Sequence, residues 1–544
     1  MRSKTLNLEF KLYIWLIVAA VLLGVSLVFE SKGKSVWSLL WLTLGGFCVY
    51  MFAAQLCPFL NLWDEQYHAV VARNCMEHPF SPMLYQDNIV PGHDYSAWPA
   101  SAIWLHKQPL FLWQIALSFK IFGVSLLSLR LPSVIMCTLM IPLGYRIAKL
   151  LTNDYKTAYF TAVAIACSWY LILLTSGIES TDHNDVCFVF YVTASVWAFI
   201  EYEHRDNHKY CWAILVGLLA GAAVLTKWMP GLLVYLCWGI YLLSEKGFKI
   251  KEWNLQHLIV ALVVTTAVVL PWQLFILKQF PDMARQELLY NFKHFNNEIE
   301  LHNEPALYFL QILPMQYVGH GYRAHKVGFQ WNTETIIIYC VLVFGLVLLL
   351  RNMKKRSHRI TTIACLLFVY LFFSIAKTKM PSFTFIVCII WFMSLGSFVG
   401  WVVERVHGWV RQPAIRSVLL AIIVFGTAFY QLNFPNYRKM QFSWVTDKMM
   451  YNQKVFESWK GKTPEGCYIF NVNAANDHFT YLLNAPAMFF SGRECYPELP
   501  LYDDLKALQA KGIKIAVVDM PGLIQQEVIA DSSFIHLPPE PVGF

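Results

Sequence analysis

VWSLLWLTLGGFCVYMFAAQ, residues 36–55, is a run of twenty residues without a charge, and NLWDEQYH, residues 61–68, follows it after a short link. A helix that crosses the hydrocarbon core of a bilayer needs about 20 mostly apolar residues. The first stretch therefore predicts a spanning helix, and the second places two adjacent carboxylates, Asp64 and Glu65, just beyond its end. Charged groups beside a span are costly unless they are solvated or used, so this junction indicates both a fold class and a candidate site.

The composition of the whole chain agrees with a membrane protein. Of its 544 residues, 57% are hydrophobic and 14% are charged, against about 25% charged in a soluble protein. This excludes a soluble enzyme, a disordered scaffold and a secreted disulfide-rich protein. The net charge of +8 is typical of cytoplasmic loops in membrane proteins and indicates no nucleic-acid partner. The 13 cysteines include no CxxC pair.

Apolar runs predict about 11–13 spans. Residues 211–243 are long enough for two short spans, with a break between them near Lys227, Pro230 and Gly231. The clear candidate spans are residues 12–29, 36–56, 131–150, 157–176, 184–201, 257–277, 334–350, 360–376, 380–401 and 415–432.

The positive charges decide the status of residues 109–125, a short apolar stretch that contains Gln114 and Lys120. If it does not span, sixteen Lys and Arg fall in inner loops, and the short outer loops hold Lys227, Lys377 and Lys379. Since cytoplasmic loops are enriched in Lys and Arg, we expect a non-spanning helix at the outer surface. This topology places Arg2, Lys4 and Lys11 outside, against the same rule, and that conflict stays open.

The topology predicts two domains. Residues 1–432 form the transmembrane domain, with large outer loops at 57–130 and 278–333 around a cavity. Residues 433–544 form an extracytoplasmic α/β domain, in which 467–472 and 514–519 read as strands and 503–511 as a helix that ends at Gly512. Cys467 and Cys495 are the cysteines of this tail, and a disulfide or two free thiols are both compatible with the sequence.

The predicted outer side carries most of the candidate functional residues. If residues 64–68 are helical, Asp64, Tyr67 and His68 share one face. The two carboxylates could instead complement a helix dipole. Lys107 precedes Pro109 at a helix start, a position that suits either anion binding or a lysine that reaches the headgroups.

A second group of polar residues lies farther along the chain. Asp182, His183 and Asp185 fall at the outer end of a span. They suit either a site or a solvated turn that Asp185 caps. Lys227, Lys377 and Lys379 lie on the side that disfavours lysine, and an anionic ligand is the simplest reason. His294 and His302 are weak candidates for metal ligands.

In their order, these motifs resemble those of the GT-C membrane glycosyltransferases. The similarity is greatest to the bacterial branch that includes the lipid A aminoarabinose transferases and is related to the protein O-mannosyltransferases. The resemblance covers about residues 36–400. The motifs that carry it are Asp64-Glu65 with Ala72-Arg73, Lys107-Gln108-Pro109-Leu110, Ser128 to Ser133 around Arg130 and Pro132, Asp185, Leu225-Thr226-Lys227 with Pro230-Gly231, and Ala376 to Pro381.

The resemblance implies a polyprenyl-phosphate-linked sugar as donor substrate and juxtamembrane helices in the first outer loop. It implies that Asp64 is the essential acidic residue, that Lys107 contacts the lipid phosphate, and that Asp185 is a second acidic position. Relatives often carry Arg at the position of Tyr67, Glu at that of His106 and Pro at that of Gln108, and Arg near His294. The change at His106 leaves metal dependence unknown, so a divalent ion stays open and no tightly bound cofactor is expected.

We therefore expect sugar transfer to a lipid, glycan or protein at the outer face of a bacterial inner membrane. The catalytic candidates are Asp64, Glu65 and Asp185, with Asp64 as general base or as the residue that orients the acceptor. Lys107, Arg130, His294, Lys377 and Lys379 are the candidates for stabilising the charge of the leaving phosphate. A transporter or flippase of a lipid-linked solute is the alternative, although the sequence shows no repeated halves.

Overall fold

The computed structural model describes residues 2–95, 97–179, 182–253, 255–297, 304–319, 332–432, 444–473, 482–520, 522 and 524–541. The chain forms two compact units, each discontinuous in sequence. The first unit comprises residues 1–54, 133–175 and 183–434, and the second comprises 55–132, 176–182 and 435–544.

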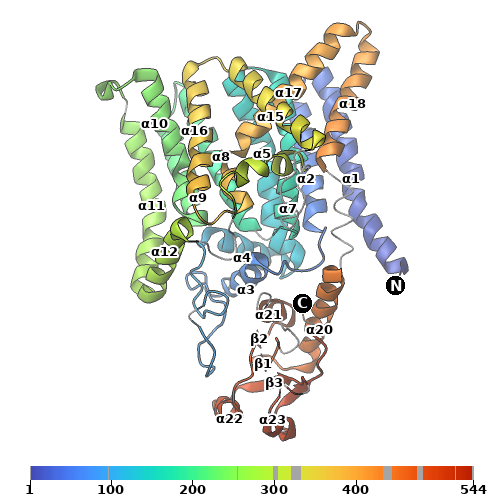
Figure 1. Ribbon diagram of the computed structural model, residues 1–544, viewed down its shortest axis with the longest axis vertical. Coiled ribbons are helices and arrows are strands. Elements are labelled where there is room, and N and C mark those ends of the chain that lie inside the picture. The colour runs from blue at the N-terminus through green and yellow to red at the C-terminus, as the bar shows by residue number, and fades with distance from the viewer. Residues whose placement is uncertain are drawn as a thin grey trace. The chain divides into compact units, whose positions relative to one another are not determined.

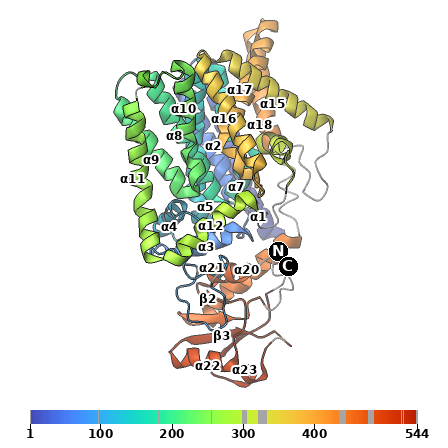
Figure 2. The ribbon, with the colours of Figure 1, turned by 60° about the vertical axis from the view of Figure 1, so that its left-hand side comes forward.

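The first unit is a bundle of long apolar helices (Figures 1 and 2). Within the described part of the chain, eleven helices are long and apolar enough to cross a membrane, which confirms the predicted polytopic fold. Its main helices are α1 (Arg2–Ser31), α2 (Ser35–Ala54), α5 (Leu126–Thr152, which begins in the second unit), α6 (Tyr155–Ala166), α7 (Trp169–Ser176), α8 (His183–His204), α9 (Lys209–Lys227), α10 (Leu233–Lys246), α11 (Leu255–Gln279), α15 (Thr333–Asn352), α16 (Arg356–Ile375), α17 (Cys388–Trp409) and α18 (Pro413–Leu432).

Connecting helices lie between these in the sequence. They are η1 (Met229–Leu232), η2 (Ile250–Glu252), α12 (Pro281–Asn296), α13 (Tyr308–Gln311), α14 (Leu313–Val318) and η3 (Pro381–Val387). The helix pair α6–α7 is buried from Thr157 onward. Figure 2 shows α12 turning away from the end of α11.

The predicted break between α9 and α10 is present. Trp228 takes a positive φ of 61°, and Pro230 has no N–H with which to continue α9. A Cβ on Gly231 would lie 2.7 Å from the backbone nitrogen of Val224. Glycine is therefore required where η1 turns back on α9.

The second unit holds two helices of the first predicted outer loop, α3 (Asp64–Asn74) and α4 (Leu110–Phe122). With 13 residues and a rise of about 1.5 Å per residue, α4 is about 20 Å long, short of the roughly 30 Å hydrocarbon core. The prediction that residues 109–125 do not span is consistent with this length.

The tail of the second unit contains a small parallel sheet in the order β2-β1-β3-β4. Its strands are β1 (Cys467–Phe470), β2 (Glu494–Cys495), β3 (Lys514–Val518) and β4 (Ile535–Leu537), and its helices are α20 (Trp444–Lys462), α21 (Asn484–Ser491), α22 (Tyr502–Ala510) and α23 (Gln526–Ala530). The register pairs Ile469 with Cys495 on one side and with Ala516 on the other. The expected α/β tail is therefore present, and Cys467 and Cys495 are both buried free thiols.

Candidate active site

The first cluster of predicted site residues is built on α3. The side chain of Asn61 accepts a hydrogen bond from the backbone N–H of Trp63 at 2.8 Å, which shapes the turn into the helix. Asp64 and Glu65 then occupy the first helical turn, where carboxylates complement the positive end of the helix dipole. Both carboxylates are buried.

Glu65 forms a two-point ion pair with Arg130. The Nε and Nη2 atoms of Arg130 donate to the carboxylate at 2.7 and 3.0 Å, and its Nη1 and Nη2 also donate to the carbonyls of Cys57 and Phe59. Arg130 is 3% exposed. Its guanidinium is thus engaged by protein groups, which favours a positioning role over the predicted contact with donor phosphate.

Gly177 makes room for this pair. A Cβ on Gly177 would lie 2.2 Å from Nη2 of Arg130 and 2.6 Å from Oε2 of Glu65, and its φ is +73°. Both the space and the backbone conformation therefore require glycine.

Asp64 faces a different cation. Its Oδ2 lies 3.7 Å from Nζ of Lys107, and the side chain of Lys107 remains 21% exposed. Lys107 precedes Pro109, the N-cap of α4. The structure therefore brings together the acidic and basic residues that the sequence assigned to catalysis and to phosphate binding.

His68 lies one turn after Asp64 on α3 and is fully buried. Its Nδ1 lies 2.9 and 3.0 Å from the two oxygens of Asp182. Its ring meets the rings of Trp104 and Phe111 edge to face, with centroids 5.5 and 4.7 Å away. No described group hydrogen-bonds to Nε2, and leaving a buried polar atom unpaired costs about 1–3 kcal/mol.

The sequence separately identified His68 and Asp182 but did not pair them. In the sequence, the i,i+4 spacing of Asp64 and His68 indicates that His68 lies on the same face of α3 as Asp64. No comparable spacing links His68 to Asp182. His106 stacks on Trp98 with ring centroids 4.6 Å apart, and it meets Trp104, the ring that also packs on His68, edge to face with centroids 5.7 Å apart.

The first unit holds a second cluster around Asp185, in the first turn of α8. The ammonium of Lys227 donates to Oδ1 of Asp185 and lies 5.5 Å from the ring centroid of Phe383. The second oxygen of Asp185 is buried, with no hydrogen-bond partner among the described residues. Lys227, which lies in a predicted outer loop, therefore neutralises a buried carboxylate.

The segment of residues 377–379 is held to the end of α12 by two hydrogen bonds. The N–H of Lys377 donates to the carbonyl of Phe295 at 3.1 Å, and the hydroxyl of Thr378 donates to the carbonyl of Asn297 at 2.9 Å. The side chain of Lys377 is exposed, whereas Lys379 is buried. His294 belongs to α12, but its side chain lies outside the described residues, as does His302.

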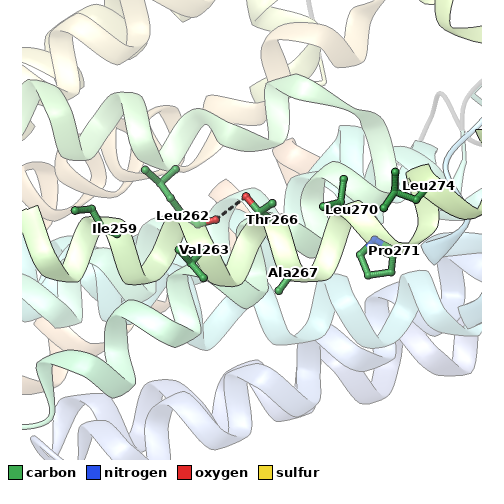
Figure 3. Close-up of a pocket in the computed structure, with 8 residues that line it drawn as sticks. All are labelled: Ile259, Leu262, Val263, Thr266, Ala267, Leu270, Pro271 and Leu274. Atoms are coloured by element: carbon green, nitrogen blue, oxygen red, sulfur yellow. Dashed lines mark hydrogen bonds between the residues drawn. The ribbon is translucent and has the colours of Figure 1, made fainter.

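Neither metal ligands nor a long apolar groove point to another site. Over the described ranges, no three His, Cys, Asp or Glu side chains are placed to hold a metal ion. A groove of about 820 Å³ runs along α11 from Ile259 to Leu274, and Figure 3 shows aliphatic side chains, Pro271 and Thr266 along it. This groove has no charged group in its lining, so it does not suit the polar chemistry of a phosphate.

The second unit joins α3 to the tail. Nη1 of Arg73 donates to the carbonyl of Met488 in α21 at 2.5 Å. Glu494 in β2 is buried, and burial raises the pKa of its carboxyl to about 7, although Arg73 opposes the shift. The Ala72-Arg73 motif was noted in the sequence, but its tail partners could not be predicted because they lie about four hundred residues away.

Known proteins share this architecture. Residues 106–274 match the family model of the dolichyl-phosphate-mannose-protein mannosyltransferases. The crystal structure of ArnT from Cupriavidus metallidurans bound to undecaprenyl phosphate matches with a TM-score of 0.58, over 86% of this chain and 87% of that one, at 13% identity. The chain has the GT-C glycosyltransferase fold. The resemblance inferred from the motifs is thereby confirmed.

Other matches support this GT-C fold. The archaeal oligosaccharyltransferase AglB from Archaeoglobus fulgidus has a TM-score of 0.51 over 84% of this chain and 64% of its own, at 11% identity. Undecaprenyl phosphate-alpha-4-amino-4-deoxy-L-arabinose arabinosyl transferase 2 of Pseudomonas fluorescens is 24% identical over 52% of each chain. The corresponding transferase of Pseudomonas paraeruginosa is 26% identical over 52% of this chain and 48% of its own. The chain thus spans about half the length of the curated relatives it matches.

Proposed function

We propose that this multi-pass membrane protein is a glycosyltransferase that moves a sugar from a polyprenyl-phosphate donor to a lipid, glycan or protein acceptor. The observation that carries the proposal is the proximity of Asp64 to Lys107, 3.7 Å apart, in a chain with the GT-C fold. The named relatives are transferases that use undecaprenyl phosphate, and none of them is a transporter. We place the reaction at the outer face of the bacterial inner membrane.

In this proposal Lys107 binds the phosphate of the lipid donor. The leaving group is a phosphate whose negative charge grows as the glycosidic bond breaks, and a fixed cation stabilises that charge. The partial exposure of the Lys107 side chain leaves it accessible to a ligand. Lys377 is exposed and Lys379 is buried, and we propose them, with His294, as further phosphate contacts.

The carboxylates take distinct roles. Asp64 orients the sugar or the acceptor and holds Lys107 in position. Glu65 and Arg130 fix the start of α3 through their ion pair. Asp185, paired with Lys227, retains one buried oxygen that is available for a ligand hydroxyl.

The test measures sugar transfer from radiolabelled undecaprenyl-phosphate sugars to a membrane extract, with purified protein in nanodiscs. We expect Asp64→Asn to lower turnover by about 10²-fold or more, because misplacing a reacting group can cost about 10²-fold. Lys107→Ala should weaken donor binding as well as turnover. Lys120→Ala, which removes the exposed lysine at the other end of α4, is the matched control and should change neither.

Failure would be clear. If wild-type protein consumes no donor from a broad panel of sugars, the transferase proposal is wrong. If Lys107→Ala and Lys120→Ala behave alike, Lys107 is not the phosphate ligand.

A further inference from the structure

His68, His93 and His536 each form an ion pair with a carboxylate, and His68 differs from the other two. His93 binds Glu498 through Nδ1 at 2.5 Å and the carbonyl of Ala100 through Nε2 at 3.1 Å. His536 binds Asp519 through Nδ1 at 2.8 Å and the carbonyl of Asp531 through Nε2 at 3.4 Å. Both of these rings are satisfied at each nitrogen.

In His68 one nitrogen is held and the other is unpaired. Nδ1 faces both oxygens of Asp182, while the buried Nε2 has no hydrogen-bond partner among the described residues. An ionised carboxylate can only accept hydrogen bonds, so Nδ1 carries the proton. In the neutral ring the lone pair is then on Nε2, which is the arrangement that a base requires.

The ring lies beside the groups assigned to the reaction. Asp64 precedes His68 by one turn on the same face of α3, and Lys107 contacts Asp64. The segment that holds Asp182 also contributes Gly177, which packs on Glu65 and Arg130. The charged groups that face this region are Asp182, Arg130, Asp64, Glu65 and Lys107, and Asp182 interacts electrostatically with Arg130. The rings of Trp104 and Phe111 pack edge to face against the imidazole of His68.

We propose that His68 is the base of the transfer reaction, that Asp182 is its positioning residue, and that the acceptor reacts through a hydroxyl. This inference rests on the proposed function. Nε2 takes the hydroxyl proton as the acceptor oxygen forms its bond to the anomeric carbon. The bond from that carbon to the phosphate oxygen breaks, and its electron pair leaves with the lipid phosphate.

The same geometry argues against a phosphate acceptor. A phosphate oxygen is already ionised at neutral pH and needs no base. An unpaired neutral acceptor atom in this place instead matches an O–H donor.

The first experiment uses wild-type protein in nanodiscs, a radiolabelled undecaprenyl-phosphate sugar and a membrane extract from cells lacking this protein. One half of the extract is treated with phosphatase before the assay. We expect transfer to be retained within about threefold after the treatment. Loss of transfer on dephosphorylation would overturn the hydroxyl assignment, whether or not any variant folds.

The second experiment compares His68→Gln and Asp182→Asn with His93→Gln, the matched control in a fully satisfied pair. We expect His68→Gln to lower kcat by about 10²–10⁴-fold with the Kd for the donor unchanged, and to remove the acid limb of the pH profile of kcat/KM. Asp182→Asn should lower kcat and alter the same limb, whereas His93→Gln should leave both unchanged. A His68→Gln protein that retains near-wild-type kcat and the same pH profile would refute the role of His68.

These outcomes are separable from a failure of the proposed function. If the wild-type protein consumes no polyprenyl-phosphate sugar, the transferase proposal itself is wrong. If the wild-type protein is active, but transfer is lost after phosphatase treatment and His68→Gln keeps near-wild-type kcat, only the inference about His68 and the hydroxyl acceptor fails.

Discussion

At the scale of single residues, burial decides which charged groups are available to a ligand. Glu65 and Arg130 are both almost completely buried and satisfy each other, while the side chain of Lys107, beside the buried Asp64, stays 21% exposed. The sequence indicated that all four belong to one region. It could not show which pair is structural. That depends on the carbonyls of Cys57 and Phe59 and on Gly177, which the fold brings to Arg130 from distant segments.

The Glu65–Arg130 pair yields a stability prediction. Removing one partner leaves a buried charge uncompensated, which costs about 3–5 kcal/mol. Glu65→Leu and Arg130→Met should each lower the free energy of unfolding by about this amount, measured by SDS-induced unfolding of detergent-solubilised protein. The double variant Glu65→Leu with Arg130→Met should lose less than the sum, and additive losses would contradict the pairing.

Glu494 yields a prediction about pH. Because burial raises the pKa of its carboxyl from 4.5 to about 7, the folded chain holds a proton between these pH values that the unfolded chain releases. This contribution to stability is therefore complete at low pH and lost as pH rises through about 7. Glu494→Gln should remove this dependence on pH. At pH 8, where wild-type Glu494 is a buried charge, the variant should be more stable than wild type by on the order of 3 kcal/mol.

Thermal unfolding at pH 5 and pH 8 checks this, and the exposed Glu527→Gln serves as control. Equal shifts at both pH values would show that Glu494 does not titrate in this range.

At the scale of elements, apolar length and charge placement were sufficient to predict most helices and the non-spanning α4. The contacts between helices were not predictable in the same way, since they depend on which faces meet. Gly217 and Gly221 of α9 illustrate this. They are four residues apart, and α9 packs there directly against α11, the close approach that small residues permit in membranes.

A larger side chain at this contact should separate the two helices. A Cβ on Gly217 would lie 2.5 Å from the carbonyl oxygen of Ala261, and one on Gly221 would lie 2.8 Å from the side chain of Val268. We expect Gly217→Leu to destabilise the protein by about 1–3 kcal/mol or more, seen as a lower Tm in a detergent thermal-shift assay. Gly239→Ala in α10, where a Cβ meets nothing within 4 Å, should change Tm little, and equal shifts would refute the contact.

At the scale of the whole molecule, the charge bias predicts which surface faces the cytoplasm. Cys211 is exposed near the start of α9, beside a predicted inner loop that holds Arg205 and Lys209. A membrane-impermeant maleimide should therefore label Cys211 in inverted vesicles and spare it in spheroplasts. A cysteine introduced by Ser532→Cys, at an exposed tail position, should show the reverse pattern, and the same pattern for both would contradict the predicted topology.

The division into units was less accessible to the sequence. The change in composition near residue 432 predicts one boundary, and that boundary remains a prediction. The structure adds that residues 55–132 and 176–182 join the tail in one compact unit. Arg73 and Met488, 415 positions apart, show why: a hydrogen bond to a backbone carbonyl leaves no signature in residue type.

The discontinuity of this second unit has a consequence for biogenesis. Its first segment ends at residue 132 and its last begins at 435, so about three hundred residues are made between them, which takes about 15–60 s at typical synthesis rates. During that interval the N-terminal segment is already made, while the carbonyl of Met488 that Arg73 uses does not yet exist. The second unit can therefore be completed only after the final stretch of the chain has been made.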